Sequence, residues 1–176
     1  MDQLAGLGVV TQHTSTFDNS TVIEVSPNSL YDPASKWGTP LQLGARWSSA
    51  SPDSVALLLA YDSDVANANP AYLNLTGLDI NIDGAMSSYQ AAQPTNLSSG
   101  AYNTVSRTIY TSSENAVVVP YSVLQRMVAA KNCRIRIHTG SGNQDADFSA
   151  DHIPGGKATA ITSIRTFMAK VAAVRH

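Results

Sequence analysis

The densest group of side chains that could hold a metal ion lies in residues 138–152. Two histidines and three aspartates fall within these fifteen residues, and imidazole and carboxylate groups are common protein ligands of divalent cations. Their spacing matches neither the calcium-binding loop nor the His-Glu-x-x-His helix of zinc hydrolases. Two hypotheses therefore stay open for this segment: a hairpin with polar ends, or a metal site with the candidate ligands Asp145, Asp147, Asp151 and His152.

The same segment offers a second kind of site, a cradle for a phosphate group. Gly140, Ser141 and Gly142 could expose backbone N–H groups, with two arginines close in sequence. Neither of the two common nucleotide-binding patterns, GxGxxG and GxxxxGK[ST], is present. A glycine turn is therefore the simpler interpretation.

A basic face is predicted just before this segment. Arg134, Arg136 and His138 alternate with three apolar residues, and alternation over a strand places all three basic side chains on one side. Together with Arg107 they form a candidate site for a small anionic ligand or an acidic protein partner. The alternative is an exposed face, or one neutralised by ion pairs with acidic residues of the first half of the chain.

The charges are divided unevenly along the chain, although the net charge is only -2. Residues 1–100 carry two basic and nine acidic side chains, whereas residues 101–176 carry nine basic and four acidic ones. A net charge near zero gives no overall field that favours nucleic acid or membrane surfaces. Nucleic-acid binding normally needs a denser basic stripe with aromatic residues for stacking, so we expect no nucleic-acid partner.

Nucleophilic catalysis has little support in the sequence. The single cysteine, Cys133, cannot form an internal disulfide, and its place between a predicted helix and a predicted strand is typical of a small buried apolar residue. Serine, histidine and aspartate are all present, but the Gly-x-Ser-x-Gly turn of many serine hydrolases is not. We expect no cofactor.

Two helices are predicted to support these segments. The first, near 121–131, follows Pro120, and proline is favoured at the start of a helix. The second, near 157–173, carries six apolar residues at helical spacing. Burying those six side chains is worth on the order of 10 kcal/mol before conformational entropy is subtracted, so we expect the domain to unfold without this helix.

The remaining segments mostly predict strands. Residues 41–47 alternate between apolar and polar types, and residues 55–61 are apolar on both faces, as in a covered central strand. Asp83-Gly84 predicts a hairpin turn. Residues 102–110 are expected to form one strand, and residues 91–100 resemble a linker.

These elements predict an α+β fold in a single domain, residues 1–176. A mainly antiparallel sheet of about six to eight strands would be covered on one face by the two helices, in line with typical sheet sizes. The apolar stripes of the helices are expected to pack on residues 55–61 and on Ile135 and Ile137.

Function is only weakly indicated. Charged residues make up 14% of the chain, against about 25% in average soluble domains, which favours a location outside the cytoplasm. We expect a non-enzymatic binding or assembly protein of a bacterial cell envelope, periplasmic or secreted, with a cytoplasmic location as the alternative. One functional alternative is a metal-assisted hydrolase with its site at the 138–152 loop, and another is a subunit of a larger self-assembling particle. No run of 18 apolar residues occurs, so no transmembrane segment is expected.

Overall fold

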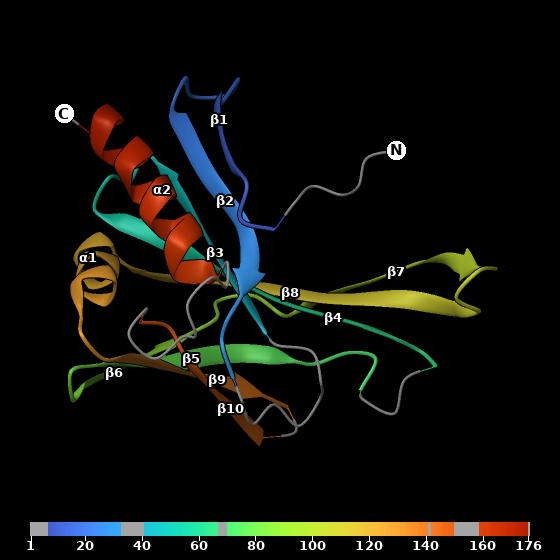
Figure 1. Ribbon diagram of the computed structural model, residues 1–176. Coiled ribbons are helices and arrows are strands. Elements are labelled where there is room, and N and C mark those ends of the chain that lie inside the picture. The colour runs from blue at the N-terminus through green and yellow to red at the C-terminus, as the bar shows by residue number, and fades with distance from the viewer. Residues whose placement is uncertain (1–6, 33–40, 67–69, 141, 150–158, 176) are drawn as a thin grey trace.

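The computed structural model describes residues 7–32, 41–66, 70–140, 142–149 and 159–175. Within these residues the chain forms two antiparallel sheets and two helices (Figure 1). The predicted α+β fold, built mainly from antiparallel strands, is confirmed. The described residues contain ten strands, and these divide between two sheets where the sequence suggested one sheet of about six to eight.

The larger sheet has six strands in the order β1-β2-β3-β4-β8-β7. Most neighbours in this sheet are also neighbours in sequence. The exception is β4, which pairs with β8 although the first hairpin of the smaller sheet and β7 lie between them in the sequence. The strand bounds are Val10–Thr14 for β1, Thr21–Ser29 for β2, Gln42–Ser48 for β3, Ser54–Asp64 for β4, Asn96–Asn103 for β7 and Thr108–Pro120 for β8.

The smaller sheet has four strands in the order β10-β9-β5-β6. The predicted turn at Asp83-Gly84 is confirmed, because both residues have positive φ angles, of 49° and 95°, and they join β5 to β6. The strand bounds are Leu75–Ile82 for β5, Ala85–Gln90 for β6, Cys133–Thr139 for β9 and Gly142–Asp147 for β10.

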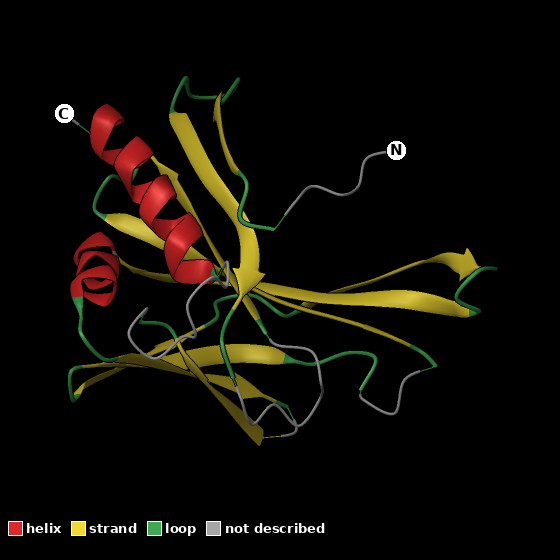
Figure 2. Cartoon of the chain, viewed as in Figure 1, coloured by secondary structure: helices red, strands yellow, loops and turns green. Residues whose placement is uncertain are grey.

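The helices are α1, Tyr121–Ala129, and α2, Ala160–Val174, and both lie on the same side of the six-stranded sheet (Figure 2). α1 begins directly after Pro120, as expected, and α2 covers most of the predicted range, of which residues 157 and 158 lie outside the described residues. α2 packs on β2 and β3 rather than on β4, because α1 follows β8 directly and takes the place beside β4 and β8. Neither described helix is long and apolar enough to cross a membrane.

The core is one continuous cluster shared by both sheets and both helices. On β4 the buried side chains alternate, with Val55, Leu57, Leu59 and Tyr61 facing the core. The opposite face of β4 is only half-covered at Ala56 and Leu58, although its sequence predicted burial on both sides. A central strand in this fold therefore has one fully buried face and one face close to solvent.

β2 continues through Pro27 to Ser29. Its register against β3 shifts between Val25 and Asn28, and Pro27 lies within that irregularity, where no ladder hydrogen bond is needed from its missing N–H. The bulged backbone lies so close to β3 that a Cβ at Gly44 would be 2.4 Å from the carbonyl oxygen of Val25. Gly44 is thus needed for the close approach of the two strands.

The prediction for residues 91–110 was wrong in two respects. Asn96–Asn103 forms the strand β7, although this stretch resembles a linker in sequence. Residues 104–107 form a turn rather than the middle of a strand, and Val105 in this turn is 92% exposed. The side chain of Asn103 explains the turn, because its Oδ1 accepts hydrogen bonds from the backbone N–H groups of Val105 and Ser106 at 2.9 and 3.0 Å.

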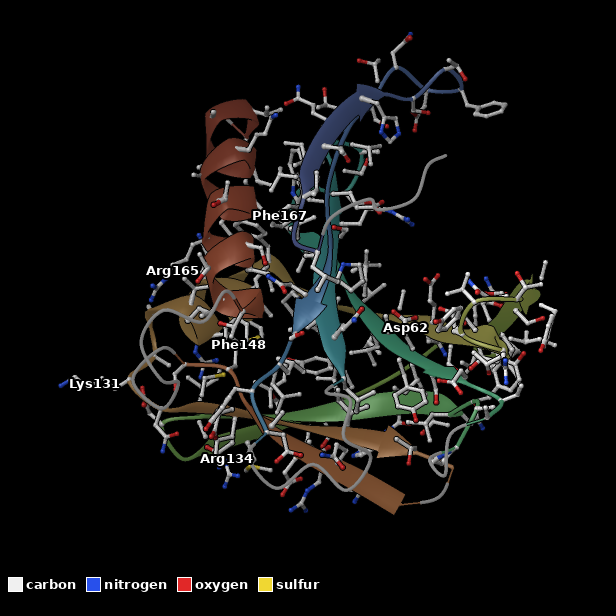
Figure 3. All side chains as sticks on the ribbon, turned by 45° about the vertical axis from the view of Figure 1, so that its right-hand side comes forward. Asp62, Lys131, Arg134, Phe148, Arg165 and Phe167 are labelled. Carbon is white, nitrogen blue, oxygen red and sulfur yellow. The ribbon has the colours of Figure 1, made fainter. Side chains whose placement is uncertain are left out.

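Replacing Phe167 by alanine is expected to lower the free energy of unfolding by about 3–5 kcal/mol, since its fully buried ring points from α2 toward β2 and β3 (Figure 3). Arg165→Ala, on the exposed side of the same helix, is the control and should change stability by less than about 0.5 kcal/mol. Urea unfolding followed by circular dichroism would measure both. Equal effects of the two substitutions would contradict the assignment of α2 as a core element.

Candidate functional site

The predicted basic face exists, and it lies on the outer side of the four-stranded sheet. β9 is flanked by β10 on one side and β5 on the other. The register places Arg136 opposite Asp145 of β10 and opposite Asp79 of β5, and it places Arg134 opposite Asp147. The alternation that puts the basic side chains on one face also puts carboxylates of both neighbouring strands on that face. We call this group the charged ladder: Asp79, Arg134, Arg136, His138, Asp145 and Asp147.

Each basic member of the charged ladder contacts a carboxylate. Arg136 binds Asp145 in a two-pronged geometry, with Nε to Oδ1 at 2.6 Å and Nη2 to Oδ2 at 3.0 Å. Arg134 Nε lies 3.0 Å from Asp147 Oδ1, and His138 Nε2 lies 3.0 Å from Asp79 Oδ2. The guanidinium groups stay half-exposed on the lower side of the molecule, where Arg134 is labelled in Figure 3.

These contacts shift the acid–base equilibria in the directions that ion pairing requires. The hydrogen bond from Arg136 lowers the pKa of the Asp145 carboxyl, and the same bond raises the pKa of Arg136. The pKa of Asp79 is lowered first by the hydroxyl of Ser88, which donates to its Oδ1 at 2.6 Å, and then by His138. Both carboxylates are therefore held in their charged form.

The charged ladder provides little room for a ligand. The hollow beside it has a volume of about 130 Å³ and is lined by Asp79, Met86, Arg134 and Arg136 among others. Pockets that enclose small molecules usually measure roughly 300–1,000 Å³. An incoming anion would also have to compete with the carboxylates that already hold both guanidinium groups. Anion binding by this face stays a prediction.

Arg107 does not join the other three basic residues. It lies in the turn between β7 and β8 with a φ angle of 57°, which is a left-handed backbone conformation, whereas the charged ladder lies on the smaller sheet. The structure thus brings Arg134, Arg136 and His138 together and separates Arg107 from them.

The candidate metal ligands are only partly covered by the described residues. Asp145 and Asp147 lie on β10 and contact arginines, whereas Asp151 and His152 lie outside the described residues. Among the residues that the structure describes, no three histidine, cysteine, aspartate or glutamate side chains are grouped so that they could hold a metal ion. The metal-assisted hydrolase stays a prediction. The suggested phosphate cradle includes Ser141, which also lies outside the described residues.

Cys133 is a core residue rather than a nucleophile. Its side chain is fully buried at the start of β9, and burial raises the pKa of its thiol to about 12, with a smaller contribution from Asp83. At neutral pH such a thiol is almost entirely protonated and therefore unreactive. This agrees with its interpretation from sequence as a small apolar side chain.

Sequence reasoning missed an exposed surface on the hairpin of β7 and β8. We call residues 96–110 the hairpin arm; Figure 1 shows β7 and the facing part of β8 extending away from the two helices. All eight residues of β7 are exposed. Four large apolar or aromatic side chains of the arm are at least half-exposed: Leu97 at 51%, Tyr102 at 59%, Val105 at 92% and Tyr110 at 50%.

One sequence feature could have pointed to this surface. Residues 91–106 contain no charged side chain, yet they include a leucine, a tyrosine and a valine. A solvent-exposed segment of that length normally carries charges, which keep edge strands from pairing with other chains.

Comparisons with protein-family models, with curated proteins and with solved structures each find no match to this chain.

The charged ladder makes the stability of the protein depend on pH. Asp79 and Asp145 have pKa values in the folded state below the unfolded value of about 3.8, so their contribution is full above about pH 4 and is lost as the pH falls further. Asp145→Asn should lower the free energy of unfolding at pH 7 by about 0.2–1 kcal/mol, as expected for a half-exposed pair. Asp79→Asn should lower it by about 1 kcal/mol, because the Asp79 side chain is only 18% exposed and accepts hydrogen bonds.

At pH 3 the two variants and the original protein should differ less than they do at pH 7. Asp62→Asn, which removes an exposed carboxylate from β4, controls for the loss of one negative charge. Urea unfolding at both pH values measures these differences. A difference from the original protein that stays the same at both pH values would contradict a role of these carboxylates as charged partners.

Proposed function

We propose that this chain is a non-enzymatic binding or assembly protein that contacts its partner through the hairpin arm. The observation that supports the proposal is the group of exposed apolar and aromatic side chains on one projecting hairpin. Single exposed apolar residues are normal on protein surfaces, but several on one projecting element are typical of interaction sites. Tyrosine in particular is enriched in protein interfaces.

The arm is held firmly along β8, which favours a binding role. Three polar side chains of this strand are buried: Thr108 directly after the turn at the tip of the arm, and Thr111 and Ser113 just beyond residue 110. Thr111 donates to the carbonyl of Ala71 at 2.5 Å, and Ser113 accepts from the backbone N–H of Leu73 at 3.0 Å. A surface that is already ordered loses less conformational entropy when it binds, so more of the contact energy appears as affinity.

A further contact fixes the strand just beyond the base. Asn115 Nδ2 donates to the carbonyl oxygens of Leu75 at 2.8 Å and Gln93 at 3.0 Å. These bonds tie β8 to the first residue of β5 and to the segment that leads into β7. The direction in which the arm projects is therefore set by bonds to both sheets.

The charged ladder supports this proposal less directly. Its two arginines are already neutralised by carboxylates of the neighbouring strand, so it adds a polar, balanced surface rather than a strong binding site. The bacterial cell envelope and the periplasmic or secreted location stay predictions based on the low content of charged residues.

Photo-crosslinking in cells that naturally make the protein tests the proposal. A photoreactive amino acid at Val105, the most exposed residue of the arm, should yield covalent adducts of higher mass on irradiation. The same amino acid at Ala169, an exposed position on α2, is the matched control and should give at least about fivefold less adduct. Equal yields at the two positions, or no adducts at either, would refute a binding role for the arm.

A further inference from the structure

We infer that the partner of the hairpin arm is a second copy of the same chain, paired antiparallel through the edge strand β7. The inference rests on the proposed function and specifies the partner. β7 is the terminal strand of the six-stranded sheet, so the backbone groups on its outer side are directed away from β8. Such an edge is a template for another strand.

The chemistry of β7 fits pairing with itself. In an antiparallel contact related by a twofold axis, the residue on the axis lies opposite itself and its two neighbours lie opposite each other, so a charged residue near the axis would face the same charge. β7 contains only Asn, Leu, Ser, Gly, Ala and Tyr, and it has no charged side chain. Self-pairing therefore brings no like charges together.

The other described edges fit self-pairing less well. β10 carries Asp145 and Asp147, which would approach their own copies, and β1 has only five residues. β6 is also uncharged, but it is shorter than β7, and one of its side chains, Ser88, is bonded to Asp79 of the charged ladder. β7 is the longest of these edges and is exposed along its whole length.

The bulge in β7 limits where the pairing can take place. The register against β8 is regular from Asn96 to Ser99 and shifts before Tyr102. Bulges are one way in which edge strands restrict pairing with other chains. Contact is thus confined to the regular part of the strand, residues 96–99, with the twofold axis close to Ser98.

Beyond the paired residues 96–99, the outer part of each arm lies near the start of β7 in the other copy. The antiparallel direction thus brings Tyr102 of one copy near Pro94 of the second copy, without pairing the two residues. Pro94 borders a cavity of about 330 Å³ on the outer face of the six-stranded sheet, and the lining of this cavity is mixed: Leu58 and Ala116 are apolar, whereas Glu24, Arg46 and Glu114 are charged. The ring of Tyr102 can cover the apolar part, and its hydroxyl can form a hydrogen bond with the polar part.

The contact is small, and this sets the expected strength. Stable interfaces bury about 1,200–2,000 Å² in total, and four paired residues with a few side chains per copy lie at or below the lower end. We therefore expect a dissociation constant on the order of micromolar rather than nanomolar.

Sedimentation velocity of the purified full chain over a wide concentration range tests the inference. The original protein should shift from one to two copies as concentration rises. Ser98→Lys, which sets two positive charges against each other at the axis, should weaken dimerisation at least about tenfold. Ala169→Lys adds the same charge at an exposed position on α2 and should change dimerisation less than about twofold.

Single cysteines identify the paired strand directly. Ser98→Cys should form disulfide-linked dimers under mild oxidation, because the residue on the axis lies opposite its own copy and opposite residues of antiparallel strands have Cα atoms within disulfide range. Ala169→Cys should not, and the buried Cys133 is shielded in every variant. A protein that stays monomeric at all concentrations, or that links equally at Ala169→Cys, would overturn the inference.

The result separates this inference from the proposed function. If Val105 gives adducts in cells while the purified protein stays monomeric, the arm binds a different partner, and only the inference of self-pairing fails. If there are no adducts from Val105 and no dimers, both fail.

Discussion

The arrangement of the whole molecule depends on one junction, where the middle of β8 meets the segment that enters β5. There the side chains of Thr111, Ser113 and Asn115 form hydrogen bonds with backbone groups of Ala71, Leu73 and Leu75. The bonded residues are spaced two apart along β8 and along residues 71–75, so each hydrogen bond sets the register of the next one. Buried backbone groups need partners, and here β8 supplies them from side chains instead of a sheet ladder. The junction joins the two sheets around one core, and it also sets where the arm leaves the body.

Elements defined by contacts between residues close in sequence could be predicted, whereas contacts between residues far apart in sequence could not. α1, α2 and β9 were predicted because their burial patterns are local: three or four residues apart on a helix, two apart on a strand. The junction at β8 was not, since its partners lie 40 residues away in sequence and are backbone atoms. β7 was missed for a different reason. Both of its faces are exposed, so it lacks the apolar alternation by which strands are recognised.

The candidate site shows the same limit. Alternation correctly placed Arg134, Arg136 and His138 on one face, but it could not show what faces them. Their carboxylates come from β10 and from β5, and the register of β5 depends on pairings more than 50 residues apart. A row of cations that looks like an anion site in one strand becomes a balanced surface once its neighbours are placed. Cross-strand pairs, rather than single strands, decide the charge of a sheet face.

The uneven distribution of charge along the chain bears on how a second copy could approach the uncharged strand β7 of the hairpin arm. The basic second half of the chain does not simply neutralise the acidic first half: Arg134 and Arg136 bind carboxylates of their own half, and Arg46 binds Glu24 within the first half. In the described residues, two contacts join the halves: His138 Nε2 with a carboxylate oxygen of Asp79, and the ion pair of Arg175 with Asp53. Two copies that approach through acidic surfaces repel each other, whereas β7 carries no charge. The absence of charge, together with the length and full exposure of β7, therefore makes this edge favourable for contact with a second copy.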